Sequence, residues 1–228
     1  MKKQSKNIAK IVVNFPKIKP KTKNQGEAWK AWEDGDNLVL AGSAGTGKTF
    51  LAMYLGLDHV ISQKSKKLYI VRSAVPTRDM GYLPGTLAEK IEPFEAPYKS
   101  ICLELFDNDT AIYNKLINSN QLEFITTSFI RGTQINDAVV VIDEMQNLNF
   151  HELDSVITRI GRNCRVIFSG DYYQSDFKDG YERDGIQRFL RIVERLKHFS
   201  VITFDWDDIV RSDFLRDYIM TKEMLGIK

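Results

Sequence analysis

The sequence predicts a three-layer α/β fold built on a mostly parallel β-sheet, and three observations predict it. Short apolar runs alternate along the chain with longer helical patterns. These runs are continuous rather than alternating, as in strands that are buried on both faces of a parallel sheet. Finally, one glycine-rich turn lies between an apolar run and a helical pattern, an arrangement typical of phosphate-binding folds.

Length and composition fit a single globular domain. The chain has 228 residues, 43% hydrophobic and 27% charged, which excludes collagen, a coiled coil and disorder over most of the chain. Its apolar runs are too short to span a bilayer. The cysteines Cys102 and Cys164 have neither zinc spacing nor a disulfide framework, so we expect core thiols and no metal cluster.

The expected elements follow in order. The apolar runs predict strands at 38–41, 68–71, 122–126, 138–142, 165–168 and 200–204. The helical patterns predict helices at 49–62, 149–160, 185–196 and 212–224. Asn149 is the expected N-cap of one helix, with Glu152 three residues further on as in a capping box. The stretch 73–120 is too long for a simple crossover and predicts the helical insertion.

The N-terminus differs in charge from the rest of the chain. Residues 1–23 hold eight lysines and no acid, against a total charge of +2. We therefore divide the chain into a basic arm, 1–24, and a single domain, 25–228. The arm either binds nucleic acid or is a solvated terminus. It lacks the apolar core of a signal peptide, so we expect a cytoplasmic protein without a membrane partner.

The strongest motif is a complete G-x-x-x-x-G-K-[ST] phosphate loop between the first expected strand and helix. Glycines let the backbone wrap around phosphates, and the N–H groups at the helix start point toward them. Lys48 would contact the β- and γ-phosphates of ATP, and the Thr49 hydroxyl would bind Mg²⁺. The cofactor-binding residues are Gly42, Ser43, Ala44, Gly45, Thr46, Gly47, Lys48 and Thr49.

Acidic residues follow another buried run, at the edge where the phosphate loop is expected. Asp143 is the expected second Mg²⁺ ligand, and Glu144 the general base that polarises the attacking water. The adjacent pair favours hydrolysis over simple nucleotide binding. A third polar segment, 169–176, follows the next strand, where Gln174 could bond the γ-phosphate or the water; a plain polar turn explains it equally well.

Taken together, these motifs resemble the PhoH-like ATPases, the phosphate-starvation-inducible family. The resemblance covers about 38–220 and also includes 80–85, Arg131-Gly132, 139–147 and the box 208–211. It implies a P-loop NTPase (RecA-like) fold similar to the motor domain of superfamily-one helicases. The short, lysine-rich chain resembles a phage-borne member, for which the location would be the host cytoplasm. The sequence departs from the family pattern after Arg72, where it lacks a proline, and at Met145.

The resemblance also implies roles outside the phosphate loop. Gln25 lies where helicases place a glutamine that reads adenine. Two loops correspond to those that contact single-stranded nucleic acid. The residues implied there are Arg72, Thr77, Thr127 and Ser128. Trp29 and Trp32 could stack on a base, although core packing is the better explanation.

Rapid hydrolysis usually needs an arginine finger. Because no second motor domain is visible in the sequence, we expect a neighbouring subunit to supply it, in a ring such as a hexamer. Arg211 is the first candidate, ahead of Arg131, Arg159 and Arg162.

The expected function is Mg²⁺-dependent ATP hydrolysis coupled to binding or remodelling of RNA or single-stranded DNA, as in a helicase. Two alternatives stay open. One is an assembly factor that ATP switches without motor activity, and the other is a small-molecule kinase.

Overall fold

The computed structural model describes residues 13, 15–73, 87–130, 132–171 and 180–227. Its strands are β1 Asn37–Gly42, β2 Lys67–Arg72, β3 Leu122–Thr126, β4 Ala138–Ile142, β5 Arg165–Gly170 and β6 Phe199–Phe204. Its helices are α1 Lys23–Glu33, α2 Lys48–Ile61, α3 Leu87–Leu105, α4 Thr110–Asn118, α5 Thr127–Ile130, α6 Phe150–Ile157, α7 Gly180–Val193 and α8 Asp213–Met224. Two short 3₁₀ turns, η1 Met145–Asn147 and η2 Trp206–Asp208, complete the described elements.

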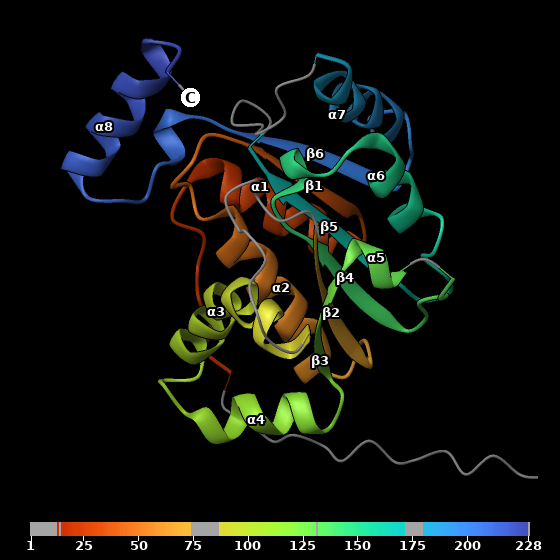
Figure 1. Cartoon of the computed structure of the whole chain (residues 1–228). Helices are drawn as coiled ribbons and strands as arrows, with labels where there is room; N and C mark the ends of the chain where they lie inside the picture. Colours follow the sequence, from red (N-terminus) through yellow and green to blue (C-terminus); the bar gives the residue numbers. More distant parts are fainter. Residues whose placement is uncertain (1–12, 14, 74–86, 131, 172–179, 228) are drawn as a thin grey trace, which may run out of the picture.

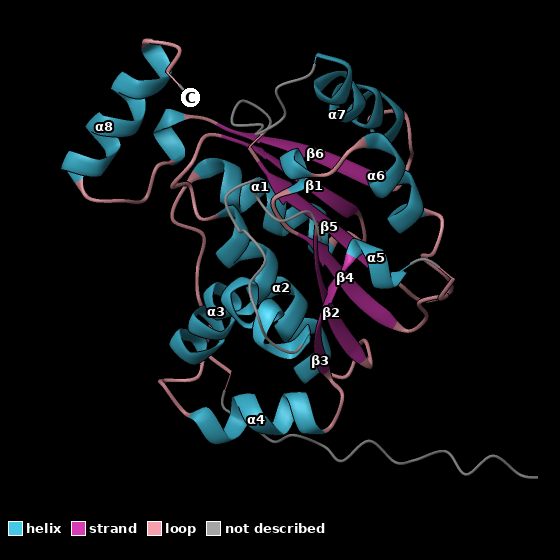
Figure 2. Cartoon of the chain, viewed as in Figure 1, coloured by secondary structure: helices cyan, strands magenta, loops and turns pink. Residues whose placement is uncertain are grey.

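The strands form one sheet in the order β3-β2-β4-β5-β1-β6, and every pair is parallel. Helices α1 to α4 pack on one face, and α5 to α7 cover the other (Figure 1). Figure 2 shows the resulting helix–sheet–helix layers. The predicted three-layer α/β fold is therefore confirmed.

Burial differs between the middle and the edges of the sheet. Strand β4 is buried at every position, and β1 and β5 at all but their first residue, as their continuous apolar runs predict. The edge strands β3 and β6 are mostly half-buried. The expectation of full burial was wrong for these two, because the helices cover an edge strand less completely than a central one.

Local chemistry explains the element ends. The Asn149 side chain accepts the Glu152 N–H, and the Glu152 carboxylate accepts the Asn149 N–H, so the predicted capping box is confirmed. Helix α6 ends at Ile157 rather than 160, and α7 begins at Gly180 rather than 185. The insertion contains α3 and α4, as expected. The core packing expected of Trp32 is confirmed, since its side chain is 5% exposed.

The described part of the basic arm packs against the domain. Phe15 stacks on Tyr54 with 5.1 Å between the ring centroids, and the Tyr54 hydroxyl donates to the carbonyl oxygen of Pro16 at 3.0 Å. Ile18 also packs on this side of the core. Helix α1 already begins at Lys23, and the boundary between an arm and a domain at residue 24 stays a prediction. Within the described residues, no helix is both long and apolar enough to cross a membrane.

Candidate nucleotide site

The sheet order brings the three predicted loops together. Strand β5 lies between β4 and β1, so the segments that follow these strands leave the same edge of the sheet side by side. In the part of the chain that the structure describes, these segments carry Asp143 with Glu144, Asp171, and the phosphate loop. Ligands of open α/β sheets bind at this carboxyl edge. A cavity of about 590 Å³ lies there, lined by residues of all three loops.

The phosphate loop depends on a close backbone approach at Gly42. This residue has φ of 129°, and a Cβ atom built on it would lie 1.9 Å from the carbonyl oxygen of Phe204. No other residue fits there without moving β6 away from β1. The loop then leads into α2, whose first residue is Lys48, so the positive end of the helix dipole faces the cavity.

Lys48 is held inside the loop and is 7% exposed. Its Nζ donates to the carbonyl oxygens of Gly42 at 2.9 Å and Ser43 at 2.6 Å. Burial lowers the pKa of the ammonium group, and the carboxylates of Asp171 and Asp143 oppose that shift. The side chain is therefore a buried cation beside the place where phosphate oxygens would supply further negative charge.

Thr49 and Asp143, the two predicted metal ligands, lie in contact. The Thr49 hydroxyl donates to Asp143 Oδ1 at 3.0 Å, and the Tyr98 hydroxyl donates to Asp143 Oδ2 at 2.9 Å. Burial first, and then the charge of Asp143, raise the pKa of Tyr98, so its phenol stays a donor. Sequence reasoning missed Tyr98, which reaches the site from α3 in the insertion.

These oxygens fit a hard divalent cation. Mg²⁺ prefers oxygen ligands and is usually bound by one or two protein groups, water and substrate phosphates. A hydroxyl and a carboxylate beside a phosphate loop meet that requirement. Among the described residues, no group of three or more His, Cys, Asp or Glu side chains could hold a metal without such help.

Glu144 is positioned by its neighbours rather than by a regular element. Its backbone is left-handed, with φ of 53°, a strained conformation for glutamate. The Gln146 amide donates to Glu144 Oε2, and Gln146 Oε1 accepts the N–H of Asp171 at 3.0 Å. Burial raises the pKa of the Glu144 carboxyl, as does Asp143, whereas Arg72 and the Gln146 hydrogen bond lower it. A raised pKa suits a general base.

The bridge through Gln146 needs a glycine opposite it. A Cβ atom on Gly170 would lie 2.3 Å from Gln146 Oε1 and 2.9 Å from the Met145 nitrogen. Gly170 therefore leaves room for the Gln146 amide, which explains why glycine is needed at this described position of the 169–176 segment. Gln174 lies outside the described residues.

Two predicted residues contact the phosphate loop of their own chain. The Gln25 amide donates to the carbonyl oxygen of Thr46 at 2.9 Å, and Gln25 Oε1 accepts the N–H of Lys21 at 2.9 Å. Arg211 Cγ lies 3.1 Å from where a Cβ on Gly45 would be, so this exposed arginine lines the same cavity. Both residues line the cavity, and reading of adenine by Gln25 stays a prediction.

The predicted nucleic-acid residues are less uniform. The Arg72 guanidinium lies 5.6 Å from the Phe94 ring centroid, at the end of β2. Thr127 is 4% exposed, and its hydroxyl donates to Glu152 Oε1 at 2.7 Å, so it faces the protein interior. Thr77 and Arg131 lie outside the described residues, as does the side chain of Ser128.

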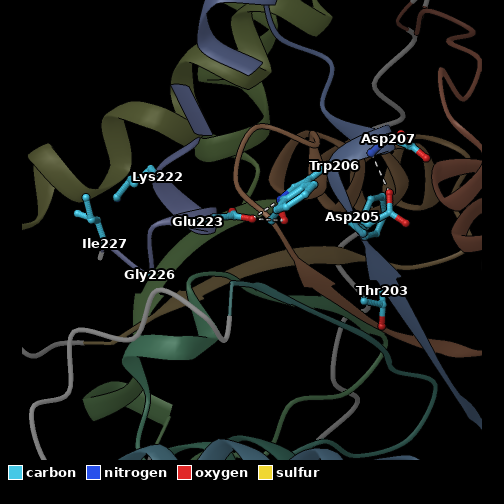
Figure 3. A pocket seen from close by; sticks show the side chains of 10 residues that line it. Thr203, Asp205, Trp206, Asp207, Lys222, Glu223, Gly226 and Ile227 are labelled. Atoms are coloured by element: carbon cyan, nitrogen blue, oxygen red, sulfur yellow. Dashed lines mark hydrogen bonds between the residues drawn. The ribbon is translucent and has the colours of Figure 1, made fainter. Parts of the chain in front are cut away.

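A second cavity, of about 670 Å³, lies between β6 and α8 on the far side of the phosphate loop. Figure 3 shows the Trp206 indole turned toward Glu223 of α8. The indole N–H donates to Glu223 Oε2, which also accepts the Ser43 hydroxyl at 3.0 Å. Sequence reasoning missed this link, which fastens the C-terminal helix to the phosphate loop.

A parallel sheet with a phosphate loop after β1 and an Asp-Glu pair after β4 defines the class of P-loop nucleoside triphosphatases. The large terminase of a thermophilic bacteriophage has a similar fold, with a TM-score of 0.54 and 12% identity over 90% of this chain and 50% of that chain. At residues 17–222 the chain matches the model of the PhoH-like protein family, and it belongs to that family. The predicted resemblance is thus confirmed.

Relatives in the family are longer than this chain. A PhoH-like protein of Mycobacterium leprae is 30% identical over 203 residues, which are 89% of this chain and 57% of that protein. The protein PhoH2 of Bacillus subtilis is 37% identical over 174 residues, 70% of this chain and 37% of that protein. The chain thus spans little more than half the length of the first relative and a smaller share of the second.

Proposed function

We propose that the protein is a Mg²⁺-dependent ATP hydrolase whose turnover is coupled to binding of RNA or single-stranded DNA. The observation that carries the proposal is the contact of Thr49 with Asp143 beside Glu144 and a buried Lys48, all at one cavity. A phosphate loop alone would support nucleotide binding. The bridged glutamate next to the metal ligand adds a base for attack by water.

Each residue of the site has its own proposed role in hydrolysis. Lys48 would leave its carbonyl partners for the β- and γ-phosphates, while the loop N–H groups hold the phosphate chain. Thr49 and Asp143 would hold Mg²⁺, which neutralises charge on the phosphates. Glu144, fixed by Gln146, would accept the proton of the attacking water. Arg211 remains the first arginine candidate for stabilising the transition state, because it lines the cavity. Its place in its own chain allows a role there, and a neighbouring subunit in a ring would otherwise supply the finger.

Two features support a nucleic-acid partner: the position of the strand ends at the edge of the sheet that carries the cavity, and the basic residues near that edge. Strands β2 and β3 end at the edge of the sheet that carries the nucleotide cavity, and the charge of Arg72, the last residue of β2, lowers the pKa of Glu144. Lys19 and Lys21 line the cavity itself, at the end of the basic arm. A ring of subunits, with a hexamer as the first expectation, and a cytoplasmic location are part of the same proposal.

The test is ATP turnover with and without single-stranded RNA or DNA over a series of salt concentrations. We expect stimulation that weakens as salt rises, because phosphate contacts release counterions. Lys48→Ala should lose tight nucleotide binding, and Lys66→Ala, an exposed lysine at the opposite end of the sheet, is the matched control. Turnover that ignores nucleic acid at every salt concentration would favour an ATP-switched assembly factor; native mass measured with ATP and Mg²⁺ addresses the ring.

A further inference from the structure

The carboxylate of Glu152 has more partners than a helix cap requires. It is the third residue of α6, and its side chain is buried. Oε2 accepts the Asn149 N–H at 3.0 Å, which completes the capping box. Oε1 accepts two further hydroxyls, from Thr127 at 2.7 Å and from Ser73 at 3.3 Å. A capping box needs only the first of these bonds, and glutamine serves it as well as glutamate.

The two hydroxyls come from two neighbouring strand ends. Ser73 directly follows β2 and Thr127 directly follows β3, whose last residues Arg72 and Thr126 are paired. Ser73 is 8% exposed and Thr127 is 4% exposed, so both bonds are shielded from water. Hydrogen bonds from a hydroxyl to a carboxylate are about twice as strong as neutral ones when they are short, as the Thr127 bond is. The Ser73 bond is longer and weaker. One buried oxygen thus holds the end of β3 firmly against α6 and also contacts the end of β2.

Helix α6 is also joined through a short segment to Glu144, the proposed general base. Only the segment 145–149 separates Glu144 from α6, and the side chains of Met145 and Leu148 are fully buried in the core. On the β2 side, the Asp143 N–H donates to the carbonyl oxygen of Val71 at 3.0 Å, directly before Glu144 in the chain. A displacement of the end of β2 can thus reach Glu144 through a backbone hydrogen bond, and a displacement of α6 can reach it through packed side chains.

We propose that Glu152 is a positioning residue that couples contact of nucleic acid with the ends of β2 and β3, at residues 72–73 and 126–127, to hydrolysis at Glu144. The inference rests on the proposed function, because it needs a nucleic-acid partner. Glu152 itself touches neither ligand. Its carboxylate makes the two strand ends and the segment that carries Glu144 move as one unit.

The test is Glu152→Gln, which retains the shape and the cap but weakens the bonds to the two hydroxyls. The ratio of turnover with single-stranded nucleic acid to turnover without it should fall by about five-fold or more. Basal turnover and ATP affinity should be retained. Asp154→Asn, on the exposed side of the same helix, makes the same charge change and should leave the ratio unaltered. The thermal midpoint of each variant is measured alongside.

A second pair of variants separates coupling from folding. Thr127→Val removes a hydroxyl at similar volume and should also lower the ratio, whereas Thr127→Ser keeps the hydroxyl and should restore it. An unchanged ratio in both Glu152→Gln and Thr127→Val would overturn the inference alone. So would a parallel loss of basal turnover and thermal midpoint in Glu152→Gln, which is the signature of a structural role. A wild-type protein without stimulation would overturn the proposed function first, before any variant is compared.

Discussion

The two ends of the sheet treat buried charge in opposite ways. At the amino end, the Arg165 guanidinium lies 3.7 Å from the Trp32 ring centroid and donates to the carbonyl oxygens of Trp32 and Asp36. His59 meets the same indole edge-on, with 5.4 Å between the ring centroids. Arg165 is thus balanced within the fold by one aromatic face, backbone carbonyls and the nearby charge of Asp36. The buried Lys67 at the same end is balanced by its ion pair with Glu123, so neither cation needs a ligand.

At the carboxyl end, charged groups face one another across a cavity. Lys48 and Asp143 are buried and Glu144 is half-buried, and each shifts the pKa of a neighbour. Their partners are hydroxyls, an amide and loop carbonyls rather than ring faces. At the amino end of the strands, buried charge is balanced by contacts within the fold. At the carboxyl end of the same strands, charged groups line a cavity in which a charged ligand could contact them. Substitutions should therefore separate activity from stability according to the end in which they lie.

The largest expected effect is at the carboxyl end. Glu144→Gln should lower ATP turnover by about 10²- to 10⁴-fold, because the amide cannot accept a proton from water. Nucleotide affinity, measured by equilibrium binding, should be retained. Glu27→Gln, exposed on α1, is the matched control. Normal turnover in Glu144→Gln would mean that another group is the base.

At the amino end, Trp32→Ala should lower the free energy of unfolding by about 3–5 kcal/mol, because a buried indole and the stacking surface of Arg165 are lost together. The KM for ATP of the folded fraction should not change. Urea denaturation and steady-state kinetics on the same preparation check both statements, with exposed Lys30→Ala as the control. Weakened ATP binding with an unchanged free energy of unfolding would contradict the statement that the amino end affects stability and the carboxyl end affects activity.

The smallest expected effect is a change of the free energy of unfolding with pH. Burial, then the charges of Arg165 and Lys64, lower the pKa of His59 from 6.5 to about 4. The unfolded chain therefore binds a proton more readily than the folded protein, so stability is complete above pH 6.5 and falls as pH drops toward 4. The loss is on the order of 1 kcal/mol once solvent screening is allowed for. His59→Phe keeps the ring contact and should flatten this part of the stability profile; an equally steep profile would assign the loss to other groups.

The sequence predicted the features that depend on local pattern. The phosphate loop, the central strands and the capping box at Asn149 each need only residues that are close along the chain. Asp143 was expected near the phosphate loop because the carboxyl ends of parallel strands lie at the same edge of a sheet, and it lies beside Thr49. These are cases in which residue type and spacing determine geometry.

The rest depends on distant segments that meet only after folding. Nothing in the sequence around Tyr98 indicates that its hydroxyl contacts Asp143, because α3 belongs to an insertion whose path over the sheet has no local code. Similarly, the contact of Gln25 with Thr46 and that of Glu223 with Ser43 join residues whose polar side chains would suit any exposed surface. Even the family resemblance, which marked Arg211, indicated no contact with its own phosphate loop.

The link between Ser43, Glu223 and Trp206 has an optical consequence. The indole N–H shares a carboxylate oxygen with a residue of the phosphate loop, so rearrangement of that loop changes the environment of a fluorophore. Trp32 lies at the opposite end of the sheet, away from any such change, whereas Trp29 lines the nucleotide cavity directly. Trp206 in η2 and Trp29 are thus built-in probes, through which occupancy of the nucleotide cavity can be followed without a label, and a Trp29→Phe variant isolates the signal of Trp206.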